Sequence, residues 1–391
     1  MGSDPQLTIG AVIPKTGRLA RLGDPMSFVL DSLSGRLPPV RAGGRRHGVR
    51  LAIRDSRSQP SGARQAVREL VETERADIVI SMVGTRVLPA VTETCESLQV
   101  PCVSTTFPWQ AYAHARDAEP GRPFRWTYHF AWGLDDIAAV FAEMWERLGG
   151  AQTVGCLWND DLQGGMLRRH FTPEATRRGH TLVDPGGYEE PADDLRDHLD
   201  HFLRFDADIV TSAATVADLA LYHRQAARAG QLPRLITCSR WLSYPHAGIA
   251  AALAEARVAT LVYWTPFHPH RSSLDDTIPA DLAAAYEQAT GRPWLQPLGL
   301  AHALVEVAHH ALATADDPAD SGAVAEAIAR TRLATVAGVL DWTNGPTPNI
   351  AVLPLIGGQW LPTRHGHELA VVTNTAAPDV PITADVTPTP R

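Results

Sequence analysis

A short polar turn follows the first apolar stretch of the chain and could hold a small ligand. Residues 9–13 read IGAVI, which is typical of a buried strand, and they lead into a turn that contains Thr16 and Gly17. Ligands of open α/β sheets bind just beyond the carboxyl ends of the strands. We therefore expect this turn to form one wall of a binding site, with Leu22 as an apolar contact.

No catalytic or metal-binding motif accompanies this turn. The sequence has no G-x-S-x-G, H-E-x-x-H or G-x-x-x-x-G-K-[ST] motif. His309 and His310 are adjacent in an alanine-rich stretch, where neighbouring helical side chains point about 100° apart. The pair His268 and His270 is a weak metal signal in a proline-rich turn. We expect a protein that is not an enzyme and that binds neither a metal nor a cofactor.

Cysteine usage gives no zinc or redox site. The cysteines at positions 95, 102, 156 and 238 form no C-x-x-C pair. A disulfide between Cys95 and Cys102 is geometrically possible across a predicted helix-to-strand turn. Small buried thiols are the alternative that we favour.

Composition excludes several classes of protein. The chain has 391 residues, 45% of them hydrophobic and 20% charged, with a net charge of −8. Its length suggests about two to three domains, and its acidic balance argues against binding to nucleic acid. No apolar run approaches the ~20 residues that span a membrane. The start MGSDPQLT lacks the features of a signal peptide, so either a signal was removed or the protein stays in the cytoplasm.

Apolar strands alternate with amphipathic helices along most of the chain. This alternation predicts parallel sheets that are covered on both faces. The alternation of strands and helices begins again at about residue 130 and continues to about 265, which predicts a second α/β unit. After a helical region, two strands at 335–342 and 349–356 are expected to close the chain. The proline- and threonine-rich tail at 375–391 is expected to be flexible.

Several stretches match the pattern of one known family. The first turn, with Thr16, Gly17, Ala20 and Gly23, is similar to that family's S/T-G-x-x-A-x-x-G pattern, and DSRSQPSGARQAV is similar to its second strand and following helix. The runs RWTYHFAWGLDDIAAVFAEMW and YWTPFHPHRSSL match a subgroup of the family. The chain thus resembles the type I periplasmic (solute) binding proteins, in the branch that includes leucine/isoleucine/valine-binding proteins.

The resemblance implies an α/β fold of two doubly wound parallel-sheet lobes. Three crossovers would join the lobes, and the ligand cleft would lie between them. The implied parts are, in chain order, lobe 1 over 1–128, lobe 2 over 129–267, the return segment of lobe 1 over 268–341, and the closing strands and flexible tail of lobe 2 over 342–391.

The resemblance also implies which positions meet the ligand. Amino-acid binders of the family grip the ligand carboxylate with backbone N–H groups and small hydroxyls at the ends of two strands. The matching positions here are Gly84 and Thr85 after one strand, and Ser104, Thr105 and Thr106 after the other. Backbone N–H groups that open a helix bind anions, and we expect Thr85 to begin such a helix. Ordinary caps and turns are the alternative interpretation.

Three positions of the implied second lobe are further candidates for ligand contact. They are Asp161, Gln163 and Thr215. The family often places a tyrosine near the position of Gln163 to cover the ligand, and this chain has none there. The missing tyrosine weakens the inference that Gln163 makes the ligand contact seen in the family.

Arg240 departs from the family pattern. Amino-acid binders keep an acidic residue after the strand that reads LITCS here, whereas this chain has Arg240 at that place. An arginine repels an ammonium group and pairs with a carboxylate. A surface arginine is the alternative. If Arg240 faces the ligand, the ligand is not a simple α-amino acid held in the family's usual way.

Tryptophans at predicted strand ends could stack on a flat ligand. Trp109, Trp132 and Trp264 are the candidates. Aromatic side chains also fill cores, and for any one of them core packing is the alternative that we favour.

The resemblance implies a solute-binding protein of an ABC-type transporter. It would close by a hinge around a small carboxylate, either an aromatic acid or an amino-acid-like compound. Its other partner would be a permease in the membrane, and its location would be extracytoplasmic. A cytoplasmic or receptor-type sensor with the same fold is the alternative, and an enzyme that borrowed the fold is the third interpretation.

Overall fold

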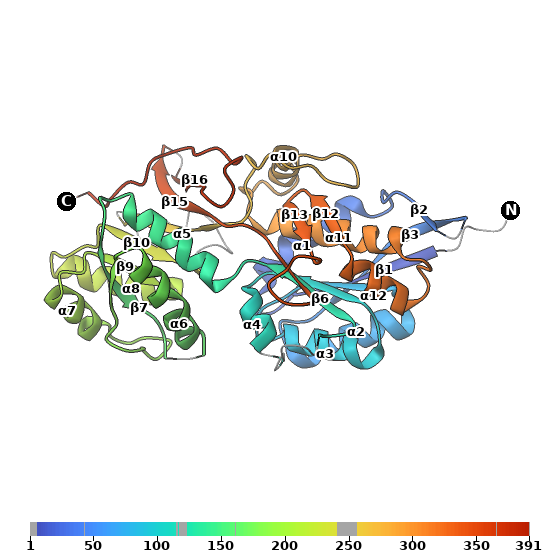
Figure 1. Ribbon diagram of the computed structural model, residues 1–391, viewed down its shortest axis with the longest axis horizontal. Helices are drawn as coiled ribbons and strands as arrows, with labels where there is room; N and C mark the ends of the chain where they lie inside the picture. The colour runs from blue at the N-terminus through green and yellow to red at the C-terminus, as the bar shows by residue number, and fades with distance from the viewer. Residues whose placement is uncertain are drawn as a thin grey trace. The chain divides into compact units, whose positions relative to one another are not determined.

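Two seven-stranded sheets form the framework, one in each of two units of the chain (Figure 1). The computed structural model describes residues 6–42, 44–114, 116, 123–160, 162–240, 256–364 and 366–390. The first unit contains residues 1–133 and 264–353, and the second contains residues 134–263 and 354–391. The chain therefore passes between the units three times.

The sheet of the first unit has the strand order β14-β6-β5-β4-β1-β3-β2. All neighbours are parallel except β2, which is antiparallel to β3. Its strands are β1 (Gln6–Ile13), β2 (Val40–Ala42), β3 (Arg45–Asp55), β4 (Ile78–Met82), β5 (Cys102–Thr105), β6 (Thr127–Ala131) and β14 (Ile350–Val352). A separate antiparallel pair consists of β12 (Arg332–Thr335) and β13 (Gly338–Asp341).

Helices cover both faces of this sheet. Helices α2 and α3 pack together on one face, and α1 and α11 pack together on the other (Figure 1). The helices are α1 (Ala20–Leu33), α2 (Pro60–Arg68), the π-helical turn η1 (Glu69–Thr73), α3 (Leu88–Leu98), α4 (Trp109–His114), α10 (Pro279–Thr290), α11 (Pro297–Thr314) and α12 (Ser321–Ala329). Both α2 and α11 have proline in the first turn, where its missing N–H breaks no helical hydrogen bond.

The sheet of the second unit has the order β16-β15-β11-β10-β9-β7-β8. Its strands are β7 (Thr153–Leu157), β8 (Thr181–Val183), β9 (Ile209–Ser212), β10 (Leu235–Cys238), β11 (Val258–Val262), β15 (Ile356–Thr363) and β16 (Gly366–Thr373). Strands β7 to β11 pair with one another in parallel, while β15 is antiparallel to both β11 and β16. The helices are α5 (Leu134–Glu146), α6 (Leu162–Arg177), α7 (Arg196–Arg204) and α8 (Val216–Arg228).

Apolar runs explain the buried strands. Every residue of β4 and of β9 is buried, as is all of β1 except its first residue. Such runs suit parallel strands that are covered on both faces, so the predicted α/β fold is confirmed. All four cysteines are buried free thiols.

The unit boundaries differ from the predicted ones. Phe130 pairs with Thr105 of β5, and Ile350 pairs with His129 of β6. The end of β6 and all of β14 therefore belong to the first sheet, although the prediction assigned 129–267 and 342–391 to the second lobe. The boundaries lie after residues 133, 263 and 353 instead.

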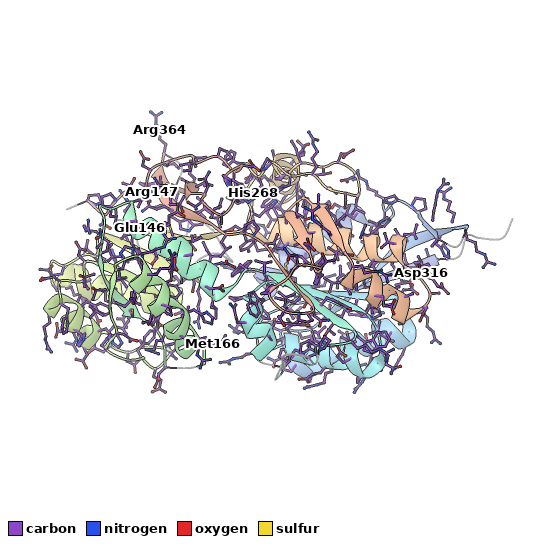
Figure 2. All side chains as sticks on the ribbon, viewed as in Figure 1. Glu146, Arg147, Met166, His268, Asp316 and Arg364 are labelled. Carbon is purple, nitrogen blue, oxygen red and sulfur yellow. The ribbon has the colours of Figure 1, made fainter. Side chains whose placement is uncertain are left out.

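The second boundary is set by packing within the first unit. Trp264 is fully buried there and lies against Gly299 of α11. His268, labelled in Figure 2, is also buried, and its Nδ1 accepts a hydrogen bond from Thr265 N at 2.9 Å. The contact with α11 places Trp264 with the first unit rather than the second.

The closing strands also differ from the prediction. Residues 335–342 include the end of β12 and all of β13, which pair around a turn rather than form one strand. The hairpin of β15 and β16 extends the second sheet beyond residue 356, where the prediction placed the last strand.

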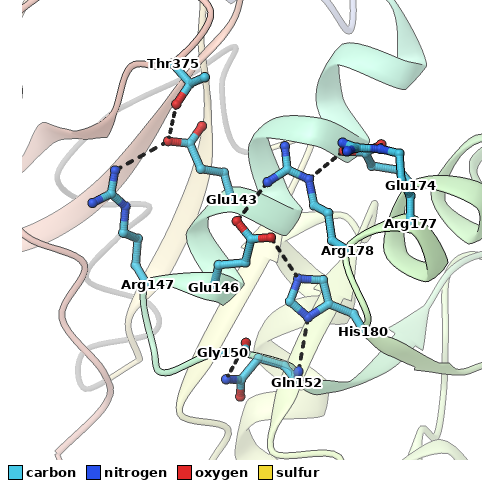
Figure 3. A network of polar contacts seen from close by, with 10 residues as sticks. All are labelled: Glu143, Glu146, Arg147, Gly150, Gln152, Glu174, Arg177, Arg178, His180 and Thr375. Atoms are coloured by element: carbon cyan, nitrogen blue, oxygen red, sulfur yellow. Dashed lines mark hydrogen bonds and ion pairs between the residues drawn. The ribbon is translucent and has the colours of Figure 1, made fainter.

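A polar network joins α5 to α6 in the second unit (Figure 3). Arg178 donates from Nη1 to Glu146 Oε2 at 2.8 Å and from Nε to Glu174 Oε1 at 2.6 Å. His180 Nδ1 accepts a hydrogen bond from Gln152 N at 3.1 Å. The network ties the end of α6 to the last turn of α5.

The C-terminal tail is attached to the second unit, so the prediction of a flexible tail is wrong. Thr375 Oγ1 donates to Glu143 Oε1 at 2.8 Å (Figure 3). Val380 is fully buried, and Thr387 N donates to Gln359 Oε1 at 2.9 Å. The proline-rich composition concealed these contacts because the partners, Glu143 of α5 and Gln359 of β15, lie outside the tail.

Candidate functional site

The carboxyl ends of β1, β4, β5 and β6 follow one another along one edge of the first sheet. Thr16 and Gly17 come after β1, Gly84 after β4, Thr106 after β5 and Trp132 after β6. The structure thus brings predicted residues from four segments to the edge where α/β sheets bind ligands.

The first turn is held by the loop that follows β3. Thr16 donates from Oγ1 to Asp55 Oδ2 at 2.6 Å, and Ser58 Oγ donates to the carbonyl of Thr16 at 2.7 Å. Burial raises the pKa of Asp55, but hydrogen bonds from Thr16 and Arg57 outweigh it and hold the pKa below its usual value. Gly17 has φ 85°, and a Cβ there would lie 2.6 Å from the Arg57 carbonyl oxygen, so the turn requires glycine.

Leu19 is the apolar side chain that lies over the neighbouring strand end. A Cβ added to Gly84 would lie 2.4 Å from Leu19 Cδ1, so the two residues are in close contact. Leu22, the predicted apolar contact, is only 4% exposed and is buried in α1. Leu19 was not among the predicted contacts, although it lies in the same turn.

The predicted threonines differ in how they are used. Thr85 is exposed and precedes α3, which begins at Leu88, so the expectation that Thr85 opens a helix is wrong. Thr105 Oγ1 donates to the Phe130 carbonyl at 2.7 Å, and Thr106 Oγ1 donates to the carbonyl of Thr105. Both hydroxyl protons are therefore used within the protein, and Thr105 is 0% exposed, so of the two hydroxyls only that of Thr106 could accept a hydrogen bond from a ligand in this conformation.

The three predicted tryptophans have different environments. Trp109 is half-buried at the start of α4, and its backbone N–H donates to the Trp132 carbonyl at 2.9 Å. Trp132 and Trp264 are 2% and 0% exposed. Among these three rings, only that of Trp109 has a surface that a ligand could reach in this conformation.

A buried histidine supports the loop between β5 and α4. His129 Nε2 donates to the Phe107 carbonyl at 3.1 Å, which leaves Nδ1 to accept from Ser104 Oγ at 2.9 Å. The Tyr112 ring stacks on His129 with 4.6 Å between centroids. Burial lowers the pKa of His129 to about 4. His129 therefore holds, as a neutral ring, the loop that carries Thr106 and Trp109.

We expect acid to destabilise the first unit through His129. Its folded pKa of about 4 lies below the 6.5 of an unperturbed histidine, so the unfolded chain binds the extra proton first and stability falls as pH drops through this window. The full shift corresponds to about 3 kcal/mol. Urea unfolding from pH 7 to pH 4 should show this loss, and His129→Gln should flatten the slope. An equal slope in native protein and variant would contradict the assignment.

The second unit presents a similar edge. The carboxyl ends of β7, β9 and β10 are neighbours in its sheet. Asn159 follows β7, Thr215 follows β9 and Arg240 follows β10. Thr215 Oγ1 caps α8, since it accepts from Asp218 N at 3.2 Å and donates to Asp218 Oδ2 at 2.8 Å.

Two predicted residues of this edge are not described. Asp161 lies outside the described residues. Gln163 is in α6, and its side chain also lies outside the description.

Arg240 forms an ion pair that sequence reasoning missed. Arg240 Nη1 donates to Glu190 Oε2 at 2.5 Å, and the two side chains are 28% and 31% exposed. Glu190 lies in the loop between β8 and α7, 50 positions before Arg240. No local pattern in the sequence connects two residues so far apart.

A separate polar cavity of about 420 Å³ lies beside the start of α2 in the first unit. Arg54 and Glu69 on its wall form an ion pair with 3.0 Å between Nε and Oε2. Its lining contains none of the predicted ligand residues and consists of Arg54, Asp55, Arg57, Ser61, Gly62, Gln65, Ala66 and Glu69.

The described part of the chain contains no group of three or more His, Cys, Asp or Glu side chains that could hold a metal ion. Within the same residues, no helix has the length and apolar character needed to cross a membrane.

Comparison with known proteins gives one family and many similar folds. A family model described as periplasmic binding protein matches residues 6–352. A search of curated proteins finds no match.

Three solved structures illustrate the fold. A leucine-binding protein from Thermotoga maritima is 17% identical, with a TM-score of 0.71 over 94% of this chain and 99% of the other. A solute-binding protein of an ABC transporter from Rhodopseudomonas palustris, in complex with 4-hydroxybenzoate, is 12% identical, with a TM-score of 0.72 over 94% and 96%. Another from this organism, in complex with benzoate, is 16% identical, with a TM-score of 0.67 over 95% and 98%. These likenesses are to the fold.

Proposed function

The chain belongs to the periplasmic binding protein family, and from this premise we propose that it is the solute-binding protein of an ABC-type transporter. The similar structures from Rhodopseudomonas palustris, which are solute-binding proteins of ABC transporters, support this role. The protein would act outside the cytoplasm, close by a hinge on its solute, and deliver it to a permease in the membrane.

We further propose that the solute is a small carboxylate with a flat or aromatic body. The observation that carries this proposal is Arg240 at the carboxyl end of β10, because a guanidinium offers paired donors to a carboxylate. Two of the similar structures hold benzoate and 4-hydroxybenzoate. The half-buried ring of Trp109 would supply a stacking face.

Replacing Arg240 tests the carboxylate. Losing one charge-assisted hydrogen bond should cost about 1.5–3 kcal/mol, so Arg240→Ala should weaken carboxylate binding roughly ten- to a hundredfold. Neutral amides should bind the variant as they bind the native protein. Calorimetric titration with benzoate, 4-hydroxybenzoate and their two amides, after a thermal-shift screen, would measure the difference.

Arg196 provides the matched control. Arg196 is the first residue of α7, its side chain is 72% exposed, and it pairs with Asp194, so Arg196→Ala removes the same charge from the second unit without touching the β10 edge. An equal loss for acids and amides in Arg240→Ala would overturn the carboxylate assignment. Tight binding of leucine or valine by the native protein would overturn it as well.

A further inference from the structure

Glu190 already supplies a carboxylate to Arg240. The 2.5 Å hydrogen bond from Arg240 Nη1 to Glu190 Oε2 joins two strand-end loops of the second unit. The contact has the same chemistry as the proposed contact between Arg240 and a ligand carboxylate. A ligand carboxylate that approached Arg240 would also approach the negative charge of Glu190 and be repelled by it.

The backbone holds Glu190 in this place. Tyr188 N donates to the Trp158 carbonyl at 3.1 Å, and Asp160 N donates to the Tyr188 carbonyl at 2.8 Å. These two bonds lay the chain at Tyr188 alongside the end of β7, as a parallel bridge between Asn159 and Tyr188. The position of Glu190 opposite Arg240 is therefore built into the fold of this loop.

Polar atoms without partners surround the pair. The Tyr188 hydroxyl, Asn159 Oδ1 and Ser239 Oγ are buried and have no hydrogen-bond partner among the described residues. Tyr188 is 6% exposed, and burial, followed by the charges of Asp218 and Glu190, raises the pKa of its hydroxyl above the usual value. The hydroxyl therefore remains protonated and able to donate. Buried polar groups are normally satisfied, so this cluster lacks a hydrogen-bonding group that a ligand could supply.

We infer that Glu190 is an internal competitor, which occupies Arg240 in the ligand-free protein and is displaced by the carboxylate of the solute. This inference rests on the proposed function. Tyr188 lies two positions before Glu190, and Ser239 lies directly before Arg240. Their hydroxyls complete the subsite as polar contacts for the bound solute. Glu190 makes the site selective, because a carboxylate that forms no further hydrogen bonds does not offset the loss of the internal pair.

The variant Glu190→Gln tests the competition. Glutamine keeps the size and one acceptor oxygen but removes the charge, so 4-hydroxybenzoate and benzoate should bind about ten- to a hundredfold more tightly than to the native protein. The amides of both acids should bind native protein and variant equally. Dissociation constants from calorimetric titration would give these ratios.

Glu189→Gln is the matched control. Glu189 is exposed and adjacent to Glu190, so this variant removes the same charge from the same loop. Glu190 forms the ion pair with Arg240, whereas the charge of Glu189 is exposed to solvent, so the Glu189 variant should change the affinity less than threefold on the scale of screened surface charges. Equal tightening by both variants would overturn the inference in favour of a general charge effect.

The remaining outcomes separate the inference from the proposed function. Weaker or unchanged carboxylate binding by Glu190→Gln, together with a loss in Arg240→Ala, overturns the competition and leaves the carboxylate assignment standing. If the acids bind to Glu190→Gln but not to the native protein, the result supports the competition, because the Glu190 carboxylate then prevents a weakly binding acid from reaching Arg240. No binding of either acid to native protein or to Glu190→Gln overturns both.

Discussion

Replacing Glu306 with alanine should lower the free energy of unfolding by about 3–5 kcal/mol. Glu306 lies in α11, is fully buried, and accepts hydrogen bonds at both carboxylate oxygens. Oε2 accepts from Ser273 N at 2.6 Å and from Ser273 Oγ at 2.8 Å. Oε1 accepts from Val336 N at 2.9 Å and lies 3.1 Å from His302 Nδ1.

The large effect follows from what the substitution leaves behind. Val336 is fully buried, so its N–H would lose its partner in a place where water cannot easily replace it, and a cavity would form beside it. Glu306→Gln should also destabilise the unit, because the amide NH2 must face either the Ser273 or the Val336 N–H group. Glutamine should cost less than alanine, since it leaves one acceptor and little empty space.

Urea unfolding of the full chain would measure both effects. Glu326 is the matched control, because its side chain is 71% exposed on α12 and pairs only weakly with Arg330 at 3.5 Å. Glu326→Ala should change stability by less than about 0.5 kcal/mol. A loss in Glu306→Ala no larger than in this control would contradict the role given to the buried carboxylate.

Trp264→Ala should also destabilise the first unit by about 3–5 kcal/mol. Its ring is fully buried, and Nε1 donates to the Val336 carbonyl at 3.2 Å. A Cβ added to Gly299 would lie 2.2 Å from Trp264 Cδ1, which shows how closely the ring packs on α11. The Trp294 ring lies edge-on with 6.0 Å between centroids.

Trp109→Ala separates core packing from ligand stacking. Trp109 is only half-buried, so its loss should reduce stability less than the loss of Trp264, while it should weaken the binding of an aromatic acid. Thermal unfolding and calorimetric titration with 4-hydroxybenzoate would report the two effects separately. If Trp264→Ala kept native stability and lost only ligand affinity, the stacking interpretation of Trp264 would be correct and the core assignment wrong.

Local patterns in the sequence were sufficient to predict the fold and the family. Apolar runs such as ADIVIS form buried parallel strands because a strand covered on both faces has no polar side to show in its sequence. The turn at Thr16 and Gly17 could also be placed, since glycine is required where φ is positive. The family match over residues 6–352 confirms the resemblance that these motifs carry.

Features that depend on distant contacts could not be predicted in this way. The tail at 375–391 has the composition of a flexible segment, yet Val380 is fully buried, and Thr387 N donates to Gln359 of β15, which lies outside that stretch. Trp109 and Trp264 have the same side chain and both follow predicted strands, but the packing on Gly299 and the hydrogen bond to the Val336 carbonyl make Trp264 a core residue, whereas Trp109 is half-buried.

The candidate site shows most clearly which features follow from local sequence and which depend on the tertiary structure. The sequence by itself determined that an arginine, Arg240, stands at the end of a predicted strand. Only the tertiary structure decided that Glu190, from a loop 50 positions away, pairs with it. The strand-end position follows from hydrophobic pattern, which acts over a few residues. The charge that a ligand meets there follows from which loops the sheet brings together, and that depends on the order of its strands.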